Sequence, residues 1–98
     1  MGGRTHDFDK VFRALADETR REVLAVVARN ELPVGEVAQR MRWIVGRSTV
    51  SRHLAILRDA GLVQEEPGSD GSRHYRMQLG SSHELEQAFA AVLALWKR

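Results

Sequence analysis

Hydrophobic residues recur every three to four positions in several stretches of the chain, the spacing that places them on one face of a helix. These stretches predict helices over residues 8–16, 18–29, 34–41, 47–60 and 81–98. Leu62–Glu66 and Arg73–Leu79 are predicted to be strands, since apolar and polar residues alternate in the second and the turn-forming segment PGSDGS joins the two. The pattern therefore indicates a single, mainly helical domain, residues 1–98, with one small β-hairpin.

Residues at the ends of the predicted helices suit those positions. Asp17 is expected to cap the second helix, and Gly46 to precede the fourth. Gly61 can take the left-handed conformation that ends the fourth helix. Ser81 and Glu84 form a predicted capping box at the start of the last helix.

The fourth predicted helix has an apolar face formed by Val50, Leu54 and Leu57. Polar and basic side chains surround this face in the first turn and a half: Arg47, Ser48, Thr49, Ser51, Arg52 and His53. Short polar groups let a helix N-terminus approach base edges in the major groove, and its N–H groups suit phosphates. We therefore predict that these residues contact duplex DNA. For His53, which adjoins the apolar face, a packed and hydrogen-bonded position is the alternative.

The distribution of charge along the chain supports a nucleic-acid partner more strongly than the net charge does. The net charge is only +2. Between Arg40 and Arg58, however, there are five arginines and no acidic residue, whereas most acids precede residue 37. A local basic face is expected within a nearly neutral protein.

The order of elements, with the hairpin between the last two helices, is that of a winged helix-turn-helix. The segments FRALADETRREVLAVVA, LPVGEVAQRM, STVSRHLAILRDAGLV and SRHYRMQL resemble successive blocks of the ArsR/SmtB-type winged-helix repressors. The resemblance implies a homodimeric bacterial repressor whose recognition helix enters the major groove and whose hairpin touches the DNA backbone or the minor groove. The linker RWIVGR is longer than is usual in that family, which leaves the placement of Arg42 and Arg47 on DNA open.

Arginines outside the fourth helix are assigned by their expected element. Arg73 and Arg76 lie on the predicted hairpin, where arginine suits phosphate, and Arg73 is preferred. Arg20, Arg21 and Arg29 lie on the second helix and are expected to form surface salt bridges.

The last helix carries an apolar stripe at positions 85, 89, 92 and 96. The alternatives are an intramolecular core and a dimer interface. Because the first helix also carries apolar groups that need cover, we expect first and last helices to form a homodimer interface. Its predicted residues are Phe8, Val11, Phe12, Leu85, Phe89, Val92 and Trp96.

Catalysis, cofactors and metals find little support in the sequence. The chain has no cysteine, no phosphate-binding glycine loop and no paired carboxylates in a cleft pattern, so no enzyme and no cofactor are expected. Pro33 and Gly35 stand where one family metal site needs cysteines. Another site is represented only by His83, Glu84 and Glu86, so no metal regulation is predicted and the effector is unknown.

The cellular setting follows from hydropathy and charge. No apolar run approaches the ~18 residues of a membrane span, so a cytoplasmic, membrane-free protein is expected. The alternative to a DNA-binding repressor is a winged-helix module that binds another protein, which the acid-free arginine run disfavours.

Overall fold

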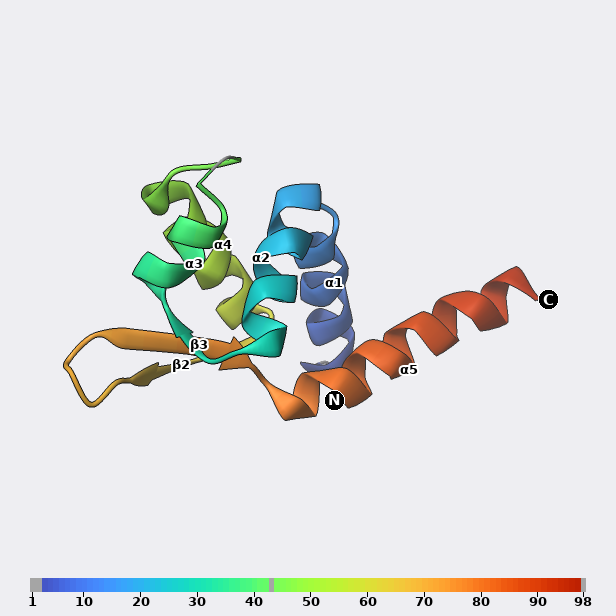
Figure 1. Ribbon diagram of the computed structural model, residues 1–98. Coiled ribbons are helices and arrows are strands. Elements are labelled where there is room, and N and C mark those ends of the chain that lie inside the picture. Colours follow the sequence, from blue (N-terminus) through green and yellow to red (C-terminus); the bar gives the residue numbers. More distant parts are fainter. Residues whose placement is uncertain (1–2, 43, 98) are drawn as a thin grey trace.

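A computed structural model describes residues 3–42 and 44–97, with the side chains of residues 3–8, 79–85, 88 and 96 outside that description. Helices and strands follow one another as α1 (Gly3–Leu15), α2 (Glu18–Arg29), β1 (Leu32–Pro33), α3 (Val34–Arg40), α4 (Arg47–Asp59), β2 (Val63–Pro67), β3 (Arg73–Met77) and α5 (Leu79–Trp96). In Figure 1 helices α1 to α4 form the body, and the β2–β3 hairpin and α5 extend from it in different directions. The fold is a winged helix-turn-helix.

Two predicted helix boundaries are confirmed by their backbone geometry. The Asp17 side chain accepts a hydrogen bond from the backbone N–H of Arg20 at 2.9 Å, as an N-cap should. Gly61 has a φ of +80°, and the N–H of Leu62 bonds the carbonyl of Leu57 at 2.9 Å. Gly61 is therefore the left-handed residue that ends α4, a conformation costly for any residue with a Cβ.

Two other boundaries were predicted wrongly. Helix α1 begins at Gly3, earlier than expected. Helix α5 begins at Leu79 with Gln78 in the N-cap position, so Ser81 lies inside the helix and does not cap it. The Gln78 N–H bonds the carbonyl of Leu62, and the chain passes from strand to helix directly after this bond.

The sheet contains a third strand that the hydrophobic pattern did not predict. Its order is β1-β3-β2, all antiparallel, with Leu32 paired to Tyr75 and Glu65 paired to the other side of Tyr75. Pro33 is tolerated because β1 is an edge strand. The pairing ties the hairpin to the connection between α2 and α3, which supports a hairpin that would be marginal alone.

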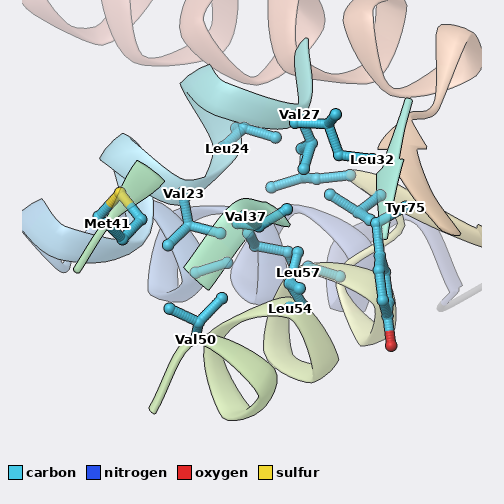
Figure 2. Packing of buried hydrophobic residues seen from close by; sticks show 14 of the residues in the cluster. Val23, Leu24, Val27, Leu32, Val37, Met41, Val50, Leu54, Leu57 and Tyr75 are labelled. Atoms are coloured by element: carbon cyan, nitrogen blue, oxygen red, sulfur yellow. The ribbon is translucent and has the colours of Figure 1, made fainter. Parts of the chain in front are cut away.

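The core lies where α2, α3, α4 and the sheet meet (Figure 2). Val50, Leu54 and Leu57 are fully buried, so the predicted apolar face of α4 is confirmed. Burial of each leucine side chain contributes about 1.5–3 kcal/mol. Val11 also lies in this core at 1% exposure, so its predicted place in a dimer interface is wrong.

Helix α5 packs against α1 and then continues past the body (Figure 1). The rings of Phe12 and Phe89 meet edge to face with centroids 6.1 Å apart. Despite this contact Phe89 remains 50% exposed, and the apolar side chains that follow it on α5 are also about half exposed: Val92, Leu93 and Leu95. The predicted interface side chains of Phe8, Leu85 and Trp96 lie outside the described residues. Within the described part of the chain, no helix is both long enough and apolar enough to cross a bilayer.

Candidate nucleic-acid interface

The first two turns of α4 present polar and basic side chains to solvent. The buried positions 50, 54 and 57 fix the orientation of the helix. Arg47, Ser48, Ser51 and Arg52 are consequently exposed, and Thr49 is half-buried. Gly46, at the N-cap, has no side chain to cover the first N–H groups. The structure thus brings five of the six predicted α4 contacts to one exposed helix end, where backbone donors are open to an anion.

The connection between α3 and α4 is closed by hydrogen bonds to Met41. The N–H groups of Ile44 and Val45 bond the Met41 carbonyl at 2.8 and 3.0 Å. The guanidinium of Arg47 lies over Gly35 of α3, where an added Cβ would meet Nη1 at 3.8 Å. The exposed side chain of Arg47 therefore leans toward α3.

His53 is buried, so its predicted DNA contact is wrong. Its side chain is 5% exposed, and Nδ1 accepts a hydrogen bond from Nε of Arg20 at 3.2 Å. Burial is the main cause that lowers the pKa of His53; the charge of Arg20 and, less, that of Arg52 act in the same direction, and Asp17 opposes them. The neutral imidazole holds α4 against α2.

Arg20 and Arg21 bind the C-terminal end of α1, although the sequence predicted surface salt bridges for both. Nη1 of Arg20 donates to the carbonyls of Arg13 and Ala14, each at 3.2 Å. Nη1 of Arg21 donates to the carbonyl of Leu15 at 2.6 Å. Carbonyls at the C-terminal end of a helix favour a nearby cation, and the Arg13 carbonyl also accepts from the N–H of Ala16 at 3.3 Å.

The hairpin is joined to the C-terminal turn of α4 by Glu65. This carboxylate, 12% exposed, pairs with Arg58 of α4 at 2.7 Å and with Arg73 of β3 at 2.5 Å. The hydrogen bond from Arg58 is the largest cause that lowers the pKa of Glu65, and Arg73 adds to it. Sequence reasoning missed both Arg58 and Glu65 as a pair, although their opposite charges on either side of Gly61 were a usable signal.

The two predicted hairpin arginines lie on opposite faces. Arg73 remains 67% exposed despite its bond to Glu65. Arg76 pairs instead with Glu66 at 3.0 Å and bonds Gln64 at 3.1 Å. Since side chains alternate along a strand, Arg76 is directed away from the surface that Arg73 shares with α4. This placement does not support the prediction that Arg76 contacts the DNA together with α4 and Arg73.

Among the described residues no three histidine or acidic side chains lie close enough to hold a metal ion. Of the three residues considered for the second family site, the side chains of His83 and Glu84 lie outside the described residues, and Glu86 is exposed.

The chain matches known regulators in sequence and structure. A family model described as a helix-turn-helix domain matches residues 15–66, just over half of the chain. An ArsR-like transcriptional regulator from Rhodococcus sp. RHA1 superposes with a TM-score of 0.78 and 31% identity, covering 98% of this chain and 88% of that one. The chain belongs to the ArsR family of winged helix-turn-helix transcriptional regulators.

Two relatives in sequence give further points of comparison. The regulator Rv2034 of Mycobacterium tuberculosis is 42% identical over 59 residues, 60% of this chain and 53% of its own length. The transcriptional activator HlyU of Vibrio cholerae is 42% identical over 53 residues, 54% of this chain and 47% of its own. The match thus spans about half the length of these two relatives.

A solved homodimeric winged helix-turn-helix DNA-binding domain, Mb0332 of Mycobacterium bovis, superposes with a TM-score of 0.71 and 26% identity, covering 92% of this chain and 80% of that one. In this ArsR-family chain α3 and α4 form the helix-turn-helix pair, and the β2–β3 hairpin is the wing.

Proposed function

We propose that this chain is a homodimeric repressor that binds an inverted-repeat operator through α4 and the wing. The observation that carries the proposal is the exposed N-terminal end of α4, which presents short hydroxyls and two arginines beside open backbone donors. Such an end fits the major groove of B-DNA, which is about 12 Å wide. No acidic residue lies between Arg40 and Arg58 to oppose the approach of phosphates.

The proposed contacts divide by element. In the major groove they come from α4: Arg47, Ser48, Thr49, Ser51 and Arg52. On the wing the contact is Arg73, because most of its guanidinium surface remains exposed beside α4. Arginine suits both roles, since its fork of N–H donors fits guanine edges and phosphate oxygens.

The proposed dimer uses the exposed apolar side of α5. Phe89, Val92 and Leu93 recur at helical spacing and are each about half exposed in the single chain. A two-fold axis through this helix pair gives two copies of α4, which require half-sites about 34 Å apart in an inverted repeat.

Repression is the proposed outcome because a dimer seated on a promoter excludes polymerase without any further contact. Relatives include both HlyU, named a transcriptional activator, and SdpR of Bacillus subtilis, named a transcriptional repressor. We also propose that zinc does not regulate the protein, since it has no cysteine and has Pro33 and Gly35 where one family site needs thiolates.

Footprinting on the DNA upstream of the gene tests this proposal. We expect protection of an inverted repeat by a dimer, and transcription from that promoter in vitro should fall as the protein is added. Protection of one isolated half-site by a monomer, or a rise in transcription, would contradict it. Stoichiometric zinc should leave the affinity unchanged, and a tenfold loss, ~1.4 kcal/mol, would overturn metal independence.

A further inference from the structure

A cavity of about 360 Å³, broadly open to solvent, lies between α1, α2 and the C-terminal half of α4. Its apolar lining comes from Ala14, Ile56 and Ala60. The volume is in the range of sites that hold small organic molecules, which combine apolar walls with a few polar groups. The cavity is separate from the exposed N-terminal end of α4 that we assign to DNA.

Three cations line the same cavity: Lys10, Arg13 and Arg20. Within the described chain, Lys10 and Arg13 take part in no ion pair, and Nη2 of Arg20 makes no hydrogen bond. The carboxylate in the lining, Asp59, is 69% exposed and faces Arg58 at 3.5 Å. Positive charge at the cavity therefore exceeds negative charge, and unused donors point to an anionic ligand.

The proposed dimer does not cover this cavity. At 3.6 residues per turn, Phe12 lies about 160° around α1 from Lys10 and Ala14. Phe12 is the residue of α1 that meets Phe89 of α5. A second copy that packs on α5 and this side of α1 leaves the opposite side of α1 open.

We propose that this cavity binds a small organic carboxylate with an apolar body, and that its occupancy weakens DNA binding through Arg20. The apolar body packs on Ile56 and the exposed edge of Ala60, with the buried Ala14 behind them, and the carboxylate accepts from Arg13 and Arg20. The DNA effect rests on the function proposed above, whereas ligand binding does not.

Arg20 links the cavity to α4 by its geometry. Its Nε donates to His53, and its Nη1 donates to two carbonyls at the end of α1. Nε–H and one Nη2–H lie along one edge of the guanidinium, the edge that binds a carboxylate side-on. A carboxylate bound there accepts the hydrogen bond from Nε–H of Arg20 in place of Nδ1 of His53. The buried His53 imidazole then lacks the hydrogen bond from Arg20. Its loss weakens the attachment of α4 to α2 about one turn from the DNA-contacting end of α4.

Direct binding is tested by NMR titration of the full chain with benzoate and hexanoate, with neutral benzamide as the matched probe. We expect saturable shifts of the Ala14, Ile56 and Ala60 amides with a carboxylate and a much weaker response to benzamide. Arg13→Gln should weaken carboxylate binding about fivefold or more, and Arg29→Gln, on the exposed side of α2, should not. The proposal of a site fails if neither carboxylate shifts these amides at ~10 mM, if benzamide binds as well, or if Arg13→Gln binds equally.

The coupling between the cavity and DNA binding is tested by measuring operator affinity with and without whichever carboxylate, benzoate or hexanoate, binds in the NMR titration. We expect operator affinity to fall about fivefold at saturation in the wild type, and Arg13→Gln to show normal affinity without ligand but little response to it. Saturable ligand binding with unchanged operator affinity would refute the coupling. If no operator is bound under any condition, the proposed function fails, and the NMR titration alone decides whether the site exists.

Discussion

At the scale of single residues, Arg52 and Arg73 are both exposed cations, but their surroundings differ. Arg52 projects from the second turn of α4 and has no ion pair within the described chain, whereas Arg73 is bound to Glu65 on the wing. Arg52→Ala should cost ~1–3 kcal/mol of operator binding and relax the preference at one base pair. Arg73→Ala should weaken all sequences alike and reduce the salt slope by about one. Fluorescence anisotropy with operator and scrambled duplexes at several salt concentrations measures both.

Arg29 provides the matched control for these two variants. It is exposed at the C-terminal end of α2, outside the helix-turn-helix pair and the wing. Arg29→Ala should change neither affinity nor salt slope. If it weakened operator binding as much as Arg52→Ala while both proteins remained folded, our assignment of the DNA-contacting surface would be wrong.

His53 predicts a pH dependence of stability. Because its folded-state pKa lies below the ordinary value of about 6.5, the unfolded chain binds more protons than the folded chain in that interval. The stabilisation is fully present above pH ~6.5 and is lost as the pH falls from there toward the folded-state pKa. Urea denaturation between pH 8 and 5 should show this loss in the wild type. His53→Gln, which keeps an acceptor for Arg20, should show much less of it, and an equal slope in both proteins would refute the assignment.

At the scale of elements, Glu65 fixes the wing against α4. Glu65→Gln removes the charge that holds Arg58 and Arg73, and we expect a loss of about 1 kcal/mol of unfolding free energy, since both arginines are partly in solvent. Glu66→Gln is the matched control on the opposite face, where the carboxylate that pairs with Arg76 is 41% exposed, against 12% for Glu65. Its cost should be smaller. Denaturant titration of both variants measures the loss of unfolding free energy. A larger loss for Glu66→Gln than for Glu65→Gln would contradict the role of Glu65.

At the scale of the whole molecule, most of the exposed large apolar side chains among the described residues lie on α5. Val92 is 46% exposed, so Val92→Glu should leave the fold of one chain intact but place charge in the proposed dimer interface. Gln87→Glu introduces the same charge on the far side of the helix. Sedimentation equilibrium should find Val92→Glu largely monomeric and Gln87→Glu dimeric. A monomeric wild type, or a dimer unaffected by Val92→Glu, would exclude the interface.

The sequence alone determined those features that depend on neighbours within about one helical turn. The Asp17 cap, the left-handed Gly61 and the buried stripe Val50, Leu54 and Leu57 were all predicted and are all present. Each is a local property, because a cap bonds residues three positions away and a stripe follows from helix geometry. The family resemblance was available for the same reason, since its blocks are these local patterns in a fixed order.

Tertiary structure decided the features that depend on residues far apart in the chain. His53 is buried because Arg20, 33 positions earlier, reaches it across two helices. Leu32 becomes a strand residue only because Tyr75 lies opposite, and Arg76 turns from the α4 side because the hairpin register pairs it with Gln64. The role of a polar side chain depends on the partner that the fold places beside it. The local sequence pattern does not reveal that partner when it is far away in the chain.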